Sequence, residues 1–205
     1  MTGRTGKRRF LGLLWSLILT CSLITGMSMS AWAQEAGTVK GADQDIVVLY
    51  TNDVHCAIDE NIGYGGLALY KKQMMNQTPY VTLVDAGDAI QGAPVGTLSE
   101  GGYIIDIMNQ TGYDVAVPGN HEFDYRSSGL ANMLNTAKAS GENVPSLVVC
   151  NVDWSAMEKA GLTEGQQQIK DAFENYGVKD YVVVQKGDVK IAVFGVFGKD
   201  SLDCA

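Results

Sequence analysis

Histidine is scarce in this sequence: His55 and His121 are the only two among 205 residues. A metal centre that needs three or four imidazole ligands therefore cannot be complete within it. Basic residues are also few, because 15 Lys and Arg stand against 23 Asp and Glu, giving a net charge of −8. This imbalance argues against binding of a nucleic-acid polymer through general attraction to its phosphates. The hydrophobic share of 46% excludes a wholly disordered chain, and the length fits one domain with or without an appendage.

Residues 1–33 have the three-part pattern of a secretory signal peptide. Four basic residues come first, an apolar stretch spans 10–24, and 31–33 reads Ala-Trp-Ala. The basic residues are Arg4, Lys7, Arg8 and Arg9. We therefore expect cleavage after Ala33 and an exported protein, which is periplasmic, associated with the cell wall or extracellular.

Two other interpretations of this N-terminal segment fit the pattern less well. A membrane-spanning anchor needs about 20 apolar residues, and polar residues from Ser22 onward interrupt the run before that length. Lipidation at Cys21 would call for a small residue where Thr20 stands. Cleavage explains the pattern better, and it predicts no transmembrane segment in the mature chain.

Removal of the signal would leave 11 basic and 23 acidic residues, a net charge of −12. A solvated acidic surface accounts for most of this charge, and carboxylate-rich pockets for cations are a second explanation. Three cysteines would remain, and their spacing matches no zinc motif. They are Cys56, Cys150 and Cys204. An odd number implies at least one free thiol or a partner outside the chain.

Strands and helices are expected to alternate after a flexible leader over 34–44. Apolar runs predict strands over 45–50 and 80–84, each buried on both faces. Further strands are predicted over 113–117, 146–150, 181–185 and 189–197, and helices over 63–78, 99–112, 128–139 and 164–176. The last two strands flank Lys186-Gly187-Asp188, a hairpin turn. This order predicts an α/β layered domain whose sheet the hairpin makes mixed.

The sequence ends seven residues after the core-like run 194–198. A buried strand without following elements suggests a fragment. We therefore expect 45–205 to be the N-terminal part of a longer domain.

Three polar clusters follow the first three predicted strands. They are Asn52-Asp53-Val54-His55, Asp85-Ala86-Gly87-Asp88 and Gly119-Asn120-His121-Glu122-Phe123-Asp124. In open α/β sheets, ligands bind beyond the carboxyl ends of the strands. Oxygen and imidazole donors gathered there suit a divalent cation.

Each cluster alone has a plain structural explanation: a capped loop for Asp-x-His, a turn for Gly-Asp, and an Asn/His-rich turn for the third. Their occurrence at three successive strand ends favours a functional site. In this combination they resemble the first three signatures of the calcineurin-like metallophosphoesterases. The Gln91-Gly92 extension and the Glu-Phe-Asp ending at 122–124 are most similar to the secreted 5′-nucleotidase branch. That branch includes UDP-sugar hydrolases and 2′,3′-cyclic-nucleotide phosphodiesterases, and the resemblance runs from Asp45 to Gly198.

The resemblance implies a layered α-β-β-α sandwich with mixed sheets, incomplete in this chain, and a centre of two divalent metal ions such as zinc or manganese. Asp53 and His55 would bind one ion, Asp88 would bridge the two, and Asn120 would bind the second. The implied catalytic pair is His121, beside the metals, and Asp124, which orients it. Asp85 would be a supporting residue, and Glu122 would pack or hydrogen-bond behind the turn.

The implied reaction is metal-dependent hydrolysis of a nucleotide or another small phosphate ester. Two ions about 3.5–4 Å apart can hold both the phosphate oxygens and an attacking water. The family completes its centre with later histidines, and this sequence has none after His121. The second ion would keep only Asp88 and Asn120 as ligands, and the nucleotide-binding C-terminal domain of the family is also missing. We therefore expect a fragment that is inactive alone, and the alternative is a non-catalytic secreted module that binds a metal or a partner.

Overall fold

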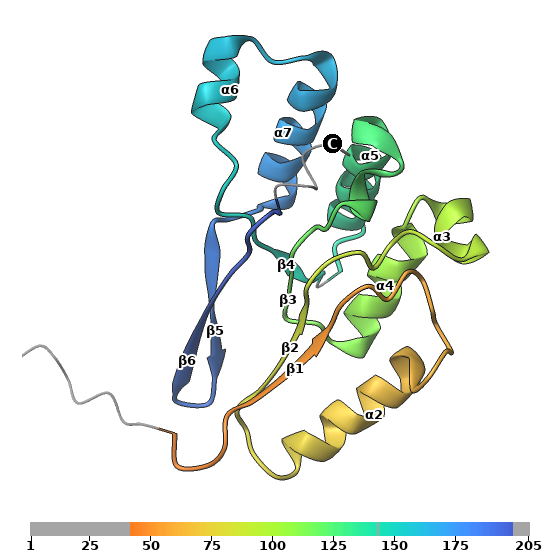
Figure 1. Cartoon of the computed structure of the whole chain (residues 1–205). Helices are drawn as coiled ribbons and strands as arrows, with labels where there is room; N and C mark the ends of the chain where they lie inside the picture. Colours follow the sequence, from red (N-terminus) through yellow and green to blue (C-terminus); the bar gives the residue numbers. More distant parts are fainter. Residues whose placement is uncertain (1–41, 143, 199–205) are drawn as a thin grey trace, which may run out of the picture. The chain divides into compact units, whose positions relative to one another are not determined.

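The computed structural model describes residues 42–142 and 144–198, and its central element is a parallel sheet with strand order β1-β2-β3-β4 (Figure 1). The strands are β1 (Val47–Thr51), β2 (Val81–Asp85), β3 (Val115–Ala116) and β4 (Ser146–Leu147). In the strand register, Thr51 pairs with Asp85, and Asp85 pairs with Ala116. The carboxyl ends of β1, β2 and β3 therefore lie side by side at one edge of the sheet.

Helices connect the strands, and the predicted α/β class is confirmed. They are α2 (Gly63–Met75), α3 (Pro94–Ser99), α4 (Gly102–Thr111), the 3₁₀ helix η1 (His121–Phe123), α5 (Arg126–Ala139), α6 (Trp154–Ala160) and α7 (Glu164–Tyr176). The core contains Ile104 of α4, Leu134 of α5 and Phe173 of α7, together with Leu83 of β2. Burial of these apolar side chains fixes the helices against the sheet.

The helix predictions are confirmed in part. The helix predicted over 99–112 is α4, which begins three residues later, at Gly102, because Gly101 before it has a left-handed φ of 89°. The short helix α3 before it was not predicted. Ser99 is the last residue of α3, and its hydroxyl still accepts from the N–H of Tyr103, in the first turn of α4, at 3.2 Å. Helix α6 was missed, although the Asp153 side chain caps it by accepting from the N–H of Ala156 at 2.9 Å. The helix over 164–176 is confirmed, and a capping box between Thr163 and Gln166 begins it.

The closing hairpin is also confirmed, as β5 (Tyr181–Lys186) and β6 (Val189–Phe194) pair antiparallel. It forms a separate two-stranded sheet, so parallel and antiparallel pairing occur in different sheets. Strand β2 is buried on both faces as predicted, but β1 is not, because Val48 is 51% and Tyr50 is 74% exposed. Val48 and Tyr50 are two residues apart and point to the same face of the sheet, so the described residues leave that face of β1 uncovered.

Several predictions concern residues that the structure does not describe. The signal peptide, most of the leader and Cys204 fall outside the described residues. Among the residues that the structure does describe, Cys56 is a buried free thiol and Cys150 is an exposed free thiol. No helix in the described part of the chain combines the length and apolarity needed to cross a membrane.

A buried carboxylate lies at the carboxyl end of β2. Asp85 accepts hydrogen bonds from the Thr51 hydroxyl and, at 2.9 Å, from the N–H of Gly87. The Thr51 hydroxyl also lies 2.9 Å from the hydroxyl of Tyr113. Burial raises the pKa of Asp85 to about 7, although both hydrogen bonds favour the ionised form and act against this rise. Folding therefore favours the protonated form of Asp85 relative to the unfolded chain.

This burial makes stability depend on pH. Between about pH 4 and pH 7, Asp85 ionises readily only in the unfolded chain, so the free energy of unfolding falls as pH rises through this window. Asp85→Asn cannot ionise and should lack this decrease. Relative to the variant, the free energy of unfolding of the wild type should fall by a few kcal/mol at most across this pH window, since one pKa unit corresponds to about 1.4 kcal/mol.

Urea unfolding followed by circular dichroism at several pH values measures this difference. Asp106→Asn is the matched control, because Asp106 is an exposed carboxylate on α4 and its loss removes one charge without removing a buried group. Equal pH slopes for the wild type and Asp85→Asn would contradict the prediction.

Candidate metal centre

The loops that follow β1, β2 and β3 lie against one another at the carboxyl edge of the parallel sheet. The backbone N–H groups of Asp53 and His55 donate to the carbonyl oxygens of Gly87 at 3.1 Å and Asp88 at 2.9 Å. The N–H of His121 donates to Oδ1 of Asp88 at 2.8 Å. The middle loop is thus bonded to both of its neighbours, and the three sequence motifs meet at one place.

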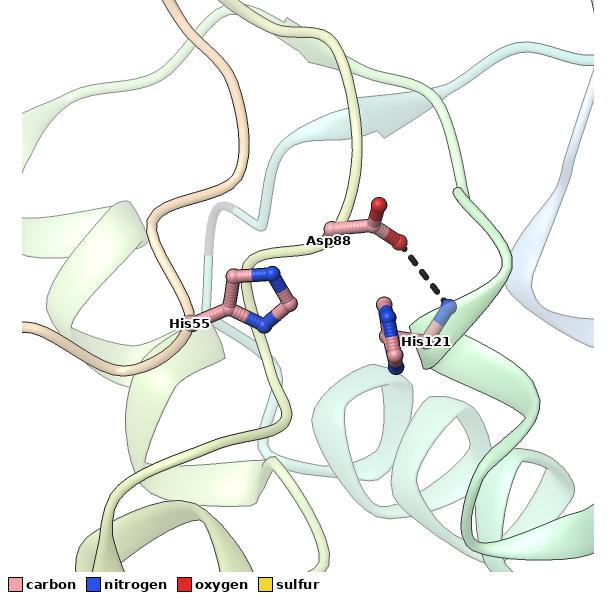
Figure 2. Close-up of side chains that lie close together, drawn as sticks. All are labelled: His55, Asp88 and His121. Atoms are coloured by element: carbon pink, nitrogen blue, oxygen red, sulfur yellow. Dashed lines mark hydrogen bonds between the residues drawn. The ribbon is translucent and has the colours of Figure 1, made fainter.

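Three of the predicted site residues form a group able to hold a metal ion: His55, Asp88 and His121, each half-buried (Figure 2). Their ligand atoms all lie within 4.8 Å of one another. The two imidazole rings have centroids 4.9 Å apart and are inclined at 73°. Two imidazole nitrogens and a carboxylate oxygen are donors that zinc and similar ions accept at about 2.0–2.2 Å. The donor set therefore fits a divalent cation.

The other two predicted ligands lie beside this group. Oδ1 of Asp53 is 4.0 Å from Nε2 of His55, and the Asp53 side chain is 56% exposed. Asn120 directly precedes η1 and is half-buried. Both residues thus belong to the assembled loops, and their role as ligands stays a prediction.

The backbone of the first loop is not extended, although in an extended strand residues two apart, such as Asp53 and His55, point the same way. Their φ angles are 53° and 49°, which is left-handed. Asp and His are among the residues that adopt this conformation most readily, and hydrogen bonds to the β2 loop hold it here. The two side chains approach each other through this turn and not through strand periodicity.

A hydrogen bond joins His121 to Asp124, and a catalytic role for this pair stays a prediction. Nδ1 of His121 lies 2.8 Å from Oδ2 of Asp124, three residues further along the chain. This hydrogen bond raises the pKa of His121 above its usual value, and burial acts in the opposite direction. The imidazole is 38% exposed, so its second nitrogen can reach a ligand from solvent.

Two residues of the second motif also support His55, and the sequence pattern assigned neither a role. Nδ1 of His55 lies 3.1 Å from the carbonyl oxygen of Gln91. A Cβ atom on Gly92 would lie 2.2 Å from the carbonyl oxygen of His55, and the φ of Gly92 is 143°. Only glycine permits this approach. The Gln91-Gly92 pair is recognisable in the sequence as part of the family resemblance. Its contact with His55 is not, because backbone atoms make that contact.

A cavity of about 610 Å³ adjoins the site beside Asp53 and His55. Its wall also includes Asn52, Asn61 and Tyr64, so polar and aromatic groups face one space next to the metal-binding group. A second cavity of about 750 Å³ is lined by residues between Ser146 and Val183 and includes none of the predicted site residues. The first cavity therefore offers space for a ligand next to the residues that could hold a metal ion.

Comparison with known proteins agrees with this arrangement. The sequence is 30% identical over 169 residues to the trifunctional nucleotide phosphoesterase protein YfkN of Bacillus subtilis, covering 77% of this chain and 11% of that protein. It is 35% identical over 104 residues to the 5′-nucleotidase of Homo sapiens, covering 44% of this chain and 18% of that protein. Over 177 residues it is 28% identical to a 2′,3′-cyclic-nucleotide 2′-phosphodiesterase/3′-nucleotidase of Haemophilus influenzae, covering 78% of this chain and 26% of that protein. No protein-family model matches the sequence.

Solved structures show the same fold. A 5′-nucleotidase precursor from Thermus thermophilus superposes with a TM-score of 0.59 at 22% identity, covering 76% of this chain and 29% of that one. The calcineurin-like phosphoesterase YfkN from Bacillus subtilis gives a TM-score of 0.51 at 22% identity, covering 76% of this chain and 49% of that one.

The chain is a homologue of the calcineurin-like phosphoesterases of the 5′-nucleotidase group. The resemblance found in the three sequence motifs is thereby confirmed. The chain spans 11% to 26% of the length of these three curated relatives. The relatives are hydrolytic enzymes, and the family depends on metal ions.

Gly119 offers a test of how closely the loops of this phosphoesterase homologue must approach. A Cβ atom on Gly119 would lie 2.3 Å from Oδ1 of Asp88 and 2.8 Å from its Cγ. Gly119→Ala should therefore displace the Asp88 carboxylate and weaken Zn²⁺ binding about tenfold or more, the range found for residues that support metal ligands. Isothermal titration of the purified chain with Zn²⁺ measures the affinity.

The matched control is Gly65→Ala in α2, where an added Cβ has no neighbour within 4 Å. This variant should bind Zn²⁺ as the wild type does and be slightly more stable, since alanine favours helix. A Gly119→Ala variant with wild-type affinity would show that the contact between the loops does not set the position of Asp88.

Proposed function

We propose that the protein is a metal-dependent phosphoesterase that hydrolyses nucleotides or similar small phosphate esters after export. The observation that carries this proposal is the convergence of His55, Asp88 and His121 within 4.8 Å at the carboxyl edge of the parallel sheet. Its support from the comparisons is that relatives of this chain are named as 5′-nucleotidases and nucleotide phosphoesterases. The signal-like sequence over 1–33 supports export.

The proposed centre holds two divalent ions, zinc, manganese or similar. Asp53 and His55 would hold the first, Asn120 the second, and Asp88 both. The middle position of the Asp88 loop, which bonds to the loops on either side, supports a shared role for its carboxylate. When bound, such ions polarise phosphoryl oxygens and activate the attacking water.

His121 would act on the substrate directly. Because Asp124 engages Nδ1, Nε2 is the nitrogen available to a substrate. Its N–H would stabilise charge on a phosphoryl oxygen or donate a proton to the leaving alcohol. The raised pKa of His121 keeps the imidazole in the donating form to a higher pH than an isolated histidine.

The test is phosphate release from 5′-AMP, with Mn²⁺ or Zn²⁺ present, by protein expressed from its complete reading frame. His121→Ala should lower turnover by a factor of about 10² to 10⁴, the usual range for loss of an acid–base group, while metal content stays at the wild-type level. Asp88→Ala should lose metal and activity together, because a carboxylate ligand is removed. Metal content by mass spectrometry and phosphate by colorimetry separate the two effects.

Loss of metal from His121→Ala would show that His121 is a ligand and not the catalytic group. A wild-type protein that binds metal but releases no phosphate from 5′-AMP, a cyclic nucleotide or a sugar nucleotide would favour the non-catalytic binding module. An exposed carboxylate supplies the control: Asp106→Asn on α4 should change neither quantity.

A further inference from the structure

Glu122 is a buried carboxylate, 6% exposed, and its charge is held by backbone groups. Oε1 accepts from the N–H groups of Ala89 at 2.9 Å and Ile90 at 3.3 Å. Oε2 accepts from the N–H of Asp88 at 2.9 Å and from the N–H of Gly119. In the described part of the chain every ion pair involves other residues. A buried ion without a paired charge is costly unless hydrogen bonds compensate, and here four donors do so.

The four donors belong to two different loops. Asp88, Ala89 and Ile90 follow β2, whereas Gly119 follows β3. One carboxylate therefore joins the two segments that carry the second and third sequence motifs. The contact is close, because a Cβ on Gly87 would lie 2.7 Å from the backbone nitrogen of Gly119.

Asp88 depends on this junction more than its neighbours do. Its φ is 60°, a left-handed conformation that costs a non-glycine residue about 1 kcal/mol. Three bonds hold it there: its N–H donates to Glu122, its carbonyl accepts from His55 at 2.9 Å, and its carboxylate accepts from the N–H of His121 at 2.8 Å. The peptide plane entering Asp88 is fixed from both sides, by the bond of its N–H to Glu122 and by the bond from the Asp53 N–H to the Gly87 carbonyl at 3.1 Å.

We propose that Glu122 is the positioning residue of the metal centre: its carboxylate sets the separation between the Asp88 carboxylate and the His121 imidazole. It touches neither the metal nor the substrate, and it acts through the backbone N–H groups of both loops. The proposal rests on the proposed function, since it assumes that His55, Asp88 and their neighbours hold a divalent cation.

The test uses Co²⁺, whose visible absorption reports ligand number and geometry, with the full chain of the wild type and of Glu122→Gln. The amide keeps the size of the side chain, but its NH₂ group would face two N–H donors, so the loops should separate. We expect Co²⁺ affinity to fall 10- to 100-fold, the range for residues that orient ligands, together with a changed visible spectrum.

Asp114→Asn is the matched control for a merely structural loss. Asp114 precedes β3 and accepts from the N–H of Leu83 at 3.0 Å and from Lys186 at 2.6 Å. This variant should lower the melting temperature of the metal-free chain while leaving Co²⁺ affinity and spectrum unchanged. Glu122→Gln should change both affinity and spectrum, whatever its melting temperature.

If circular dichroism shows that Glu122→Gln does not fold, Glu122→Asp replaces it, since it keeps the charge but withdraws the carboxylate by one methylene. The same weaker affinity and altered spectrum are expected. Wild-type Co²⁺ affinity and spectrum in a folded Glu122 variant would overturn the positioning role alone. Failure of both variants to fold would overturn it as well, because the effect would then not be specific to the centre. Absence of Co²⁺ binding by the wild type would overturn the proposed function together with this inference.

Discussion

Parallel pairing of β1, β2 and β3 is the constraint on which the rest of the site depends. Because Thr51, Asp85 and Ala116 share one level of the sheet, the segments that follow them start from neighbouring points. Hydrogen bonding continues beyond the strands, with the N–H of Cys56 donating to the carbonyl of Ala89 at 3.0 Å. The loops are thus an irregular extension of the sheet, and their polar side chains are brought together by backbone pairing before any ligand binds.

Sequence reasoning predicted this arrangement where a local pattern reports a regular element. Apolar runs mark strands because burial selects for them, as in β2, which is buried on both faces. Sequence reasoning failed where the surroundings of a residue in the folded chain, and not its local sequence, decide its structure. Nothing in the continuous apolar run over 45–50 reveals that Val48 and Tyr50 lie on an exposed face of the sheet. A glycine such as Gly101 can stand at the start, at the end or in the middle of a helix, and the neighbouring residues in the sequence do not distinguish these cases.

The same division applies within the site. Side-chain chemistry at strand ends was enough to predict His55, Asp88 and His121 as neighbours, because all three follow parallel strands. The left-handed backbone of Asp53 and His55 was not predicted, since φ angles of Asp and His depend on bonds from the adjacent loop. The four backbone bonds of Glu122 were equally hidden, because their donors are main-chain groups of Asp88 to Ile90 and Gly119.

Two buried acidic side chains at this edge differ in the number of hydrogen-bond donors around them. Asp85 has the Thr51 hydroxyl and the Gly87 N–H as donors, and burial still raises its pKa to about 7. Glu122 has four N–H donors drawn from two loops, so its negative charge is compensated where it lies. An anion held this way attracts both loops toward one point, which a neutral side chain in the same space would not do. Fixed negative charge behind the loops also favours the binding of cations in front of them. The acidic side chain of Glu122 therefore holds the loops together at this edge, and in the proposed centre it would also favour cations.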